Sequence, residues 1–468
     1  MGERSLIFYL LTFFVTCITV TWVAIICKNL LPMKFYNREP ELAQLARIEA
    51  LSQRSAQMTF VTGRRRIGKT MLLTKDRGET AFVYLFAAKK NEALLCSEFV
   101  GEIERGLGVK LYGEIRTFRD IFAFLMDLSK ERHFTVVIDE FQEFISINPS
   151  VYSDMQRIWD QEKHDSRINL ILCGSVYSLM TRIFQNAREP LFGRATQRIA
   201  VKPFDIGTLK EILGDYYAGF TPDDLLAFFL VTGGVAKYVE LLASASAFTL
   251  EAMLDELLAE NSLFLEEGRN VLIEEFGKEY GNYFSILSLI ASGKTSRAEI
   301  ESMMEMQTGG FLDRLENDYG IIKKVRPVLA KPGSRVVKYR IQDNFLSFWF
   351  RFIYKYRSAV EIGNLEYLKN IIRRDYATYS GMILEKYFLE KFIAEKKYNL
   401  VGTYWEKGNQ NEIDIVAVND LERKVVFAEV KRRKDNISLE KLMQKSILLQ
   451  RQFAGYDMQF LALSLEDM

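Results

Sequence analysis

The sequence predicts an α/β protein in which a parallel sheet with helices on both faces is followed by two smaller modules. Strand-like apolar runs alternate with helical stretches through the first half of the chain, which is typical of a parallel sheet. At 468 residues the chain is too long for one hydrophobic core. Its 49% hydrophobic and 26% charged residues are those of an ordinary folded protein. We therefore expect folded units at residues 33–260, 261–356 and 357–468, after an N-terminal stretch at residues 1–32.

Charge and cysteine content limit the classes of function. The chain has 62 lysines and arginines against 61 acids, so any contact with nucleic acid must come from local basic patches. The cysteines Cys17, Cys27, Cys96 and Cys173 are scattered without metal-ligand spacing, which favours reduced thiols in a cytosolic setting. With 2 histidines, catalysis by histidine and zinc sites are both disfavoured.

The run that begins at Leu6 and ends at Cys27 carries no charge. As a helix it would reach roughly 33 Å, enough to cross a bilayer. More basic residues follow the run than precede it, which favours a membrane anchor with the rest of the chain on the cytoplasmic face. The alternative is that Met33 opens the protein, that residues 1–32 are an upstream extension and that the chain is cytoplasmic.

The organising motif is a glycine-rich loop between a strand and a helix. Residues 58–62 have the composition of a buried strand, and residues 69–75 tolerate a helix. The backbone of such a loop cradles phosphate oxygens. A chance glycine turn is disfavoured by this context. The pattern Gly-x4-Gly-Lys-Thr predicts that phosphates bind at Gly63, Arg64, Arg65, Arg66, Ile67, Gly68, Lys69 and Thr70.

Polar residues at the ends of later strands extend this nucleotide site. Lys69 is expected on the β- and γ-phosphates, and the Thr70 hydroxyl on Mg²⁺. The apolar strand at residues 134–138 ends in Asp139, a second Mg²⁺ ligand, and Glu140, which would orient or activate the attacking water. After the strand at residues 169–173, Ser175 either senses the γ-phosphate or is a turn residue. The alternative for Asp139 and Glu140 is that they are solvated acids at an ordinary strand end. The fold expected here is that of a P-loop NTPase.

Several segments resemble the AAA+-like ATPases of archaea and bacteria that are grouped with the STAND class. The matching segments are Phe35-Tyr36-Asn37-Arg38-Glu39, the phosphate loop, Val137-Ile138-Asp139-Glu140-Phe141, Gly174-Ser175, Leu191-Phe192-Gly193-Arg194 and Thr232-Gly233-Gly234-Val235-Ala236-Lys237-Tyr238. The family usually has proline where this chain has Ala236.

The phosphate loop and the acids after the strand predict ATP and Mg²⁺ as cofactors, and a homo-oligomer or another protein partner is left open. The resemblance places Arg38 and Glu39 near the adenine edge. It also makes Arg194 a candidate contact to the γ-phosphate, either within its own chain or across an oligomer interface, because a guanidinium suits developing phosphoryl charge. The alternative for Arg194 is a structural salt bridge.

Three helices and a hairpin are expected in the middle module. The second helix opens with a capping box, Ser296 to Glu299, and the third lies around residues 311–317. Strands at residues 321–325 and 335–341 complete a winged helix. Such modules often place the third helix in a DNA major groove. Here that helix carries more acids than bases, which favours docking or relay over base reading.

The last module combines a helix with two acid-bearing strands. Glu385 lies in a helix-compatible run, Asp414 on one strand, and Glu429 and Lys431 at the end of the next. Alternation along a strand projects Glu429 and Lys431 from one face. Asp414 and Glu429 are therefore predicted ligands of one Mg²⁺, with Lys431 supporting the hydrolytic water or a phosphate.

These residues resemble the active site of the PD-(D/E)XK nuclease superfamily, which implies a small α/β restriction-endonuclease-like domain that acts on DNA. By that resemblance the active-site set is Glu385, Asp414, Glu429 and Lys431, with Ile413 in place of the proline that names the superfamily. The basic run at residues 431–434 is expected to grip a nucleic-acid backbone, or to be a solvated face. The leading interpretation is an ATP-hydrolysing switch coupled to a metal-dependent nuclease. The alternative is an ATP-dependent signalling scaffold whose last domain only binds nucleic acid or a protein partner.

Overall fold

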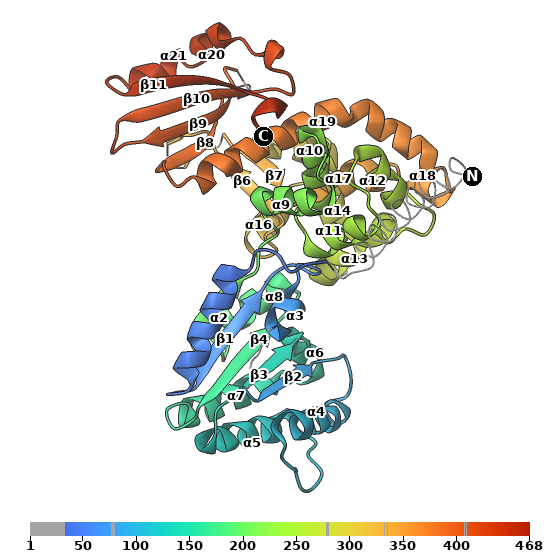
Figure 1. The fold of residues 1–468 in the computed structure, drawn as a ribbon, viewed down its shortest axis with the longest axis vertical. Coiled ribbons are helices and arrows are strands. Elements are labelled where there is room, and N and C mark those ends of the chain that lie inside the picture. The colour runs from blue at the N-terminus through green and yellow to red at the C-terminus, as the bar shows by residue number, and fades with distance from the viewer. Residues whose placement is uncertain are drawn as a thin grey trace, which may run out of the picture.

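The computed structural model describes residues 33–75, 80–277 and 280–468, apart from residues 332, 335, 407 and 409. In these ranges the chain forms a five-stranded, a four-stranded and a two-stranded sheet with helices around them (Figure 1). The predicted membrane segment from Leu6 to Cys27 lies outside the described residues. Within the described ranges, no helix has the length and apolar character needed to cross a membrane.

The five-stranded sheet is parallel throughout, as predicted. Its strands are β1 (Gln57–Thr62), β2 (Phe82–Phe86), β3 (Phe134–Asp139), β4 (Ile168–Cys173) and β5 (Gln197–Ala200), in the order β2-β3-β4-β1-β5. The β3 and β4 strands are buried along their whole length, which explains why they are continuous apolar runs. Because the strands run the same way, the residues that follow β1, β3 and β4 meet at one edge of the sheet.

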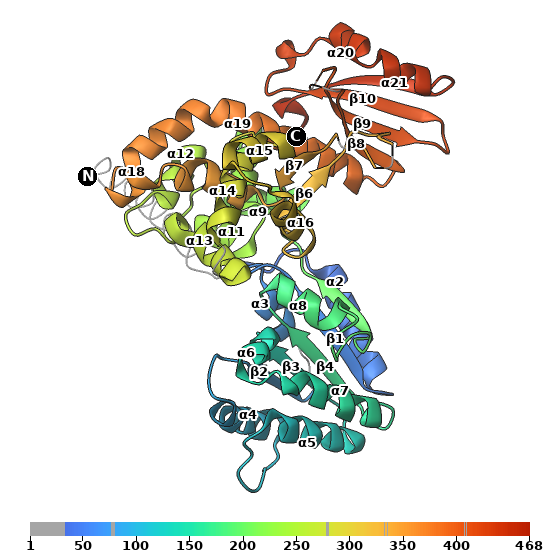
Figure 2. The same ribbon diagram turned by 180° about the vertical axis from the view of Figure 1, so that it is seen from behind.

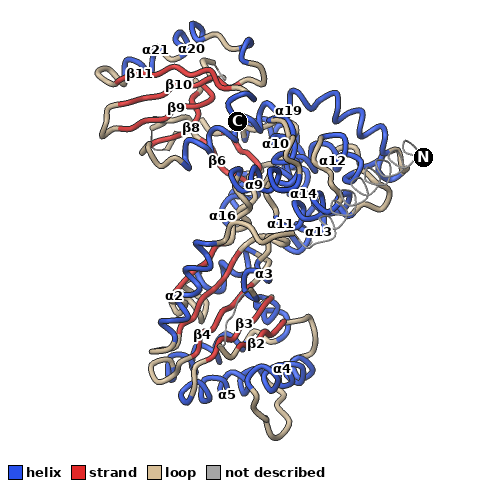
Figure 3. The backbone as a smooth tube through the Cα atoms, in the orientation of Figure 1, coloured by secondary structure: helices blue, strands red, loops and turns tan. Residues whose placement is uncertain are grey.

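Helices cover both faces of this sheet (Figure 3). The helices of this lobe are α2 (Glu39–Ser52), α3 (Lys69–Thr74), α4 (Glu92–Leu107), α5 (Phe118–Glu131), α6 (Phe144–Ile147), α7 (Ser150–Glu162) and α8 (Tyr177–Gln185). Apolar side chains of α4, α5, α7 and α8 share one core with Phe60 and Ile138, whereas those of α2 and α3 share another with Val61 and Val137. Alternate residues of one strand therefore point into different cores.

A largely helical region follows the sheet. It begins with α9 (Ile206–Tyr216), α10 (Pro222–Thr232), α11 (Ala236–Ser244), α12 (Leu250–Leu257) and α13 (Leu263–Phe276). It continues with α14 (Tyr280–Ala291), α15 (Arg297–Met304), α16 (Gly309–Asn317), the hairpin of β6 (Ile322–Val325) and β7 (Lys338–Ile341), α17 (Asn344–Phe348), the π-helix η3 (Trp349–Tyr354) and α18 (Arg357–Glu361). The predicted capping box is confirmed, since Ser296 and Glu299 each accept a hydrogen bond from the other's backbone N–H.

One long helix, α19 (Leu365–Ala394), connects this region to the four-stranded sheet (Figure 2). The sheet contains β8 (Leu400–Tyr404), β9 (Ile413–Asn419), β10 (Lys424–Val430) and β11 (Asp457–Leu463), with α20 (Leu439–Lys445) and α21 (Ile447–Gln452) between the last two strands. β8, β9 and β10 are antiparallel neighbours, and β11 is parallel to β10. One hydrophobic core runs from the first sheet through α19 to β9 and β10, crossing the predicted boundaries at residues 260 and 356.

Candidate functional site

The phosphate loop connects β1 to α3 and is closed by its own lysine. Gly68 precedes the helix with φ of +92°, a left-handed conformation that favours glycine. The Lys69 ammonium donates to the carbonyl oxygens of Gly63 and Arg64 at 2.8 and 3.1 Å. The lysine therefore points back onto the carbonyl groups of its own loop.

The helical region contacts the same loop through its backbone. The N–H of Lys237, in α11, donates to the Arg66 carbonyl oxygen at 3.1 Å. The phosphate loop is therefore held between the first sheet, from which it emerges, and the helical region that follows.

Asp139 and Thr70 lie side by side at the carboxyl edge of the sheet. The Thr70 hydroxyl donates to Asp139 Oδ2 at 3.2 Å, and the backbone N–H of Glu140 donates to Asp139 Oδ1 at 2.9 Å. Hydroxyl and carboxylate oxygens next to a phosphate loop are ligands that suit Mg²⁺. These two residues therefore fit the predicted ion, which when bound would neutralise charge on the phosphates.

Tyr84 is a neighbour of this pair that the sequence analysis missed. Its hydroxyl, on β2, also donates to Asp139 Oδ2. Burial, and then the hydrogen bond to Asp139, raise the pKa of Tyr84, so the hydroxyl stays a donor. The only signal in the sequence was a tyrosine within the short apolar run at residues 81–86.

Glu140 is held by residues from two strand ends. It has a left-handed backbone, with φ of 53°. Its Oε2 accepts hydrogen bonds from the Ser175 hydroxyl at 2.7 Å and from Gln142 Nε2 at 2.6 Å. The parallel register of β3 and β4 thus brings Glu140 and Ser175, two separately predicted site residues, into contact. Gln142 was not expected, because nothing in the local pattern distinguishes it from other polar residues.

Arg38 contacts the phosphate loop from the turn before α2. It is buried, donates to the Ile67 carbonyl oxygen at 3.3 Å, and stacks over the Phe204 ring at 4.9 Å. Burial lowers its pKa, while the nearby Glu41 acts in the opposite direction. Arg38 therefore braces the loop, and its expected position at an adenine edge stays a prediction.

Arg194 lies at the wrong end of the sheet for its predicted role. Its guanidinium donates twice to Asp160 of α7, at 3.1 and 2.8 Å. Two residues later, Thr196 donates its N–H to the oxygen of Met58, near the start of β1. The phosphate loop follows the other end of that strand, so the predicted contact within its own chain is wrong and the salt-bridge alternative holds. A contact across an oligomer interface stays a prediction.

The three arginines of the phosphate loop turn toward the helical region. Each pairs with an acid from α13 or from the turn before α17. The pairs are Arg64–Asp343, Arg65–Glu274 at 3.5 Å and Arg66–Glu267 at 2.8 Å. Glu267 is almost fully buried, which raises its pKa, while the Tyr238 hydroxyl and the arginines oppose that shift. The expectation for these side chains was phosphate contact alone, and their acid partners were not foreseen.

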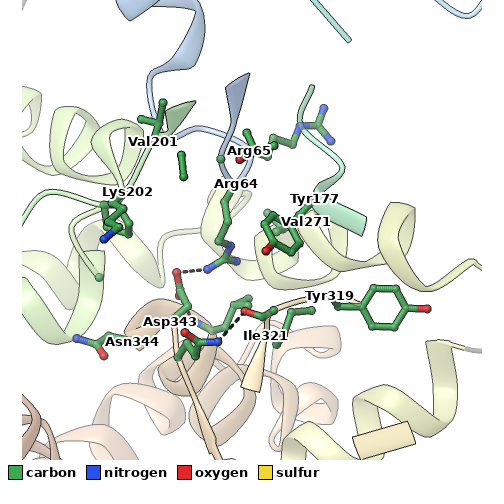
Figure 4. Close-up of a pocket in the computed structure, with 18 of the residues that line it drawn as sticks. Arg64, Arg65, Tyr177, Val201, Lys202, Val271, Tyr319, Ile321, Asp343 and Asn344 are labelled. Atoms are coloured by element: carbon green, nitrogen blue, oxygen red, sulfur yellow. Dashed lines mark hydrogen bonds and ion pairs between the residues drawn. The ribbon is translucent and has the colours of Figure 1, made fainter. Parts of the chain in front are cut away.

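A cavity of about 610 Å³ is lined by residues of both the phosphate loop and the helical region (Figure 4). The Arg64–Asp343 pair crosses it, as the close-up shows. The wall of the cavity also includes Lys386 and Glu390 of α19. The long helix that leads to the last sheet therefore reaches the surroundings of the phosphate loop.

The four residues predicted for the last module do come together. Lys431 Nζ lies 3.2 Å from Asp414 Oδ2 and 3.1 Å from Glu429 Oε1. Glu385, on α19, is close enough to Asp414 for their charges to interact, and burial followed by this charge raises the pKa of Glu385 to about 7. We call Glu385, Asp414, Glu429 and Lys431 the acid–lysine cluster.

The magnesium ion predicted at Asp414 and Glu429 lacks support. Lys445, which the sequence analysis missed, contacts both oxygens of Glu429 at 3.1 Å. Ammonium groups thus contact both oxygens of Glu429 and one oxygen of Asp414, which a metal would need as ligands. Over the described residues, no group of three or more histidines, cysteines or acids is placed to hold a metal ion. We therefore derive no metal-dependent step at this cluster.

The basic run at residues 431–434 is also largely taken up by contacts within the chain. Arg432 pairs with Asp223 of α10 at 2.9 Å, donates to Ser380 and lies over the Tyr376 ring. Lys434 lies 3.7 Å from Asp467. Arg432 therefore fastens the last module to α10 and α19, while the expected grip of this run on a nucleic-acid backbone stays a prediction for the exposed Arg433 and Lys434.

Two parts of the chain match known protein families. Residues 35–242 match a family described as an ATPase domain predominantly from Archaea, and residues 349–445 match a family described as archaeal and bacterial proteins of unknown function. An uncharacterized protein of Methanocaldococcus jannaschii is 29% identical over 406 residues, which are 85% of this chain and 87% of that protein.

The fold is similar to that of the Walker-type ATPase PABY2304 of Pyrococcus abyssi. The similarity has a TM-score of 0.52 at 18% sequence identity and covers 68% of this chain and 96% of that one. The loop with Lys69, the acids after β3 and the match over residues 35–242 lead to one conclusion. Residues 35–242 match a family of ATPase domains, and the chain is an ATPase.

Proposed function

We propose that this ATPase is a switch whose nucleotide state controls nucleic-acid chemistry or binding at the acid–lysine cluster. The observation that carries the proposal is a short series of contacts between the two sites. Arg64 of the phosphate loop pairs with Asp343. Lys386 of α19 donates to both neighbours of Asp343, the Gln342 oxygen and Asn344 Oδ1. The preceding residue of the same helix is Glu385, a member of the cluster.

Nucleotide binding supplies a physical reason for the contacts between Arg64 and Glu385 to change. A triphosphate brings several negative charges to a loop whose arginines already hold three acids. The phosphates compete with Asp343 for Arg64, because a guanidinium binds either anion through the same fork of N–H donors. A shift at Asp343 reaches Lys386 through hydrogen bonds to its two chain neighbours. Because α19 is one continuous helix, Glu385 moves with Lys386.

The ATPase residues have separate roles in this proposal. Lys69 and Thr70 bind the triphosphate with its Mg²⁺, Asp139 holds the same ion, and Glu140 with Ser175 orients the attacking water. A positioned general base contributes about 10² to 10⁴ to the rate. Removing the lysine therefore affects binding, whereas removing the glutamate charge affects the chemical step.

Two variants and one control test these roles. We expect Lys69→Ala to lose binding of a fluorescent ATP analogue, and Glu140→Gln to bind it while hydrolysing ATP at least about 100-fold more slowly. Glu143→Gln is the matched control, because this nearby acid pairs with Lys89 and not with Ser175. Normal turnover in both Lys69→Ala and Glu140→Gln would contradict the site.

Substitutions on the long helix α19 test the coupling between the nucleotide site and DNA binding. In the wild type we expect DNA affinity to differ between ADP and a non-hydrolysable ATP analogue by about 5- to 150-fold. Lys386→Met should bring this ratio close to one. Lys369→Met changes the same residue type on the same helix, but Lys369 pairs with Asp255, outside the series of contacts. An unchanged ratio in Lys386→Met, with wild-type coupling present, would refute the relay.

A second candidate function is favoured by the ammonium groups in the cluster. Lys431 and Lys445 neutralise Asp414 and Glu429, which suits a domain that binds nucleic acid or a protein partner without cutting it. Plasmid, single-stranded DNA and RNA, each with Mg²⁺ or Mn²⁺, separate the two candidates. Cleavage that is lost in Asp414→Ala and Lys431→Ala supports a nuclease. Intact ATPase activity without cleavage of any substrate supports the scaffold.

A further inference from the structure

The segment at residues 321–341 is the most one-sided stretch of charge in the middle module. It contains no acid, in a chain where 62 basic residues face 61 acidic ones. Its basic residues are Lys323, Lys324, Arg326, Lys331, Arg335, Lys338 and Arg340. Its described residues, which leave out 332 and 335, form the hairpin of β6 and β7 and part of the connection between these strands. We call it the basic hairpin.

The register of the hairpin gathers cations on one face. Lys323 lies directly opposite Arg340, and Lys338 lies opposite Val325 on the same face. The other face carries buried residues such as Ile322 and Tyr339. Like charges directly opposite each other destabilise a pair of strands. Pairing of the two strands therefore does not explain this charge, and an anion that binds the cations left exposed on the hairpin would.

Three of these cations are available to such an anion. Lys323, Arg326 and Lys331 are exposed, and none of them forms an ion pair with another described residue. Lys338 is different, because it pairs with Glu412 at 2.8 Å and lies over the Trp405 ring. The hairpin thus has an anchored part near β9 and an outer part with free positive charge.

The anchored part lies next to the acid–lysine cluster. In the loop after β6, Val328 donates its N–H to the Thr403 oxygen of β8 at 2.9 Å. The charge of Arg340 lowers the pKa of Glu385, and that of Lys323 lowers the pKa of Glu390, which follows on the same helix α19. Both views of the fold show β6 and β7 between the helical region and the last sheet (Figures 1 and 2).

We propose that the basic hairpin binds the phosphodiester backbone of a nucleic acid and leads it to the acid–lysine cluster. This inference rests on the proposed function, since that function requires nucleic acid at the cluster. A polyanion with regularly spaced charges suits several exposed cations along one hairpin. Other surfaces are poorer: Arg432 of the run at residues 431–434 is held by Asp223, and α16 carries more acids than bases.

The test removes the exposed charge and leaves the anchored part alone. The hairpin variant combines Lys323→Gln, Arg326→Gln and Lys331→Gln. The control variant combines Lys110→Gln, Arg119→Gln and Arg188→Gln, which remove equal charge from exposed positions of the first lobe that form no ion pair among the described residues. Fluorescence anisotropy of labelled duplex and single-stranded DNA is measured with the full chain at several salt concentrations.

We expect the hairpin variant to bind DNA at least about 10-fold more weakly than the wild type near 0.1 M salt. The slope of log affinity against log salt should fall by about two to three, because each lost phosphate contact contributes about 0.9. The control variant should bind like the wild type. Unchanged ATP hydrolysis in both variants shows that they fold.

Each contrary result has a distinct meaning. If the wild type binds DNA and the hairpin variant binds it equally well, or the control variant loses as much, the inference is overturned while the proposed function stands. If the wild type binds phosphatidylserine vesicles and no DNA, the inference and the proposed function both fail.

Discussion

The carboxyl group of Glu385 has a shifted pKa that makes the stability of the protein depend on pH. It lies on α19 beside Asp414, and burial, followed by that charge, raises its pKa from 4.5 to about 7. Arg340 and Lys431 oppose the shift without cancelling it. Because the pKa is raised on folding, the native state binds the proton more tightly than the unfolded chain. The resulting stability is fully present below about pH 4.5 and is lost as the pH rises through about 7.

Replacing Glu385 by glutamine should remove this dependence. We subtract the free energy of unfolding of the wild type from that of Glu385→Gln at each pH. We expect this difference to be about 2 kcal/mol larger at pH 8 than at pH 5. Urea unfolding at unit pH intervals measures the difference. Glu395→Gln, at an exposed position just after α19, is the control and should show no such trend. A pH-independent difference for Glu385→Gln would show that the carboxyl group titrates normally.

At the scale of single elements, the structure agrees best with local sequence where side chains and backbone of one segment form hydrogen bonds with each other. The second helix of the middle module is such a case. Ser296 and Glu299 close a reciprocal capping box at the start of α15, and both hydrogen bonds were foreseen from residue type and spacing. The cap fixes where the helix begins without help from distant residues.

The cap gives a simple stability prediction. Ser296→Ala should lower the free energy of unfolding by about 1 kcal/mol, since it leaves the backbone N–H of Glu299 without its acceptor. Ser285→Ala makes the same change inside α14, where alanine is the better helix former, so we expect no loss there. Denaturation midpoints of the two variants measure the contrast. Equal losses would mean that the hydroxyl at position 296 does not act as a cap.

Across the whole molecule, the two lobes are joined at the phosphate loop by ion pairs of unequal strength. Asp343 and Glu267 are largely buried, with side chains 7% and 1% exposed, so their pairs with Arg64 and Arg66 are shielded from water. In the Arg65–Glu274 pair both side chains are at least 40% exposed, and such pairs contribute little. We infer that Asp343, more than Glu274, holds the loop to the helical region.

Substitution of these two acids tests that order at the scale of the molecule. Asp343→Asn keeps the cap on α17, where Asp343 accepts the Leu346 N–H, but removes the charge that faces Arg64. We expect amide hydrogen exchange in residues 63–70 to become at least about 10-fold faster. Glu274→Gln is the matched control and should change it little. Slower or equal exchange in Asp343→Asn would show that the pair does not hold the loop.

The amino-acid sequence by itself determined the parallel sheet, the phosphate loop and the acids after β3. Each of these follows from residue types at short spacing, since a buried strand or a glycine turn is specified within a few neighbouring residues. The full membership of the acid–lysine cluster came from the resemblance to a nuclease superfamily, because Glu385 is remote in sequence from the two strands. The tertiary structure alone decided which charges meet. Arg64 and Asp343 are 279 residues apart, and Lys445 reaches Glu429 from a separate helix.

Arg194 and Arg432 show why such pairings are beyond local patterns. Both are permanently charged and stand in motifs that suit phosphate binding, yet each is neutralised by an acid on a different helix, Asp160 and Asp223. An ion pair depends on distance in space, and distance in space between remote segments is set by packing of the whole chain. The sequence therefore identifies the groups capable of each chemistry, while the fold decides which of them remain free to perform it.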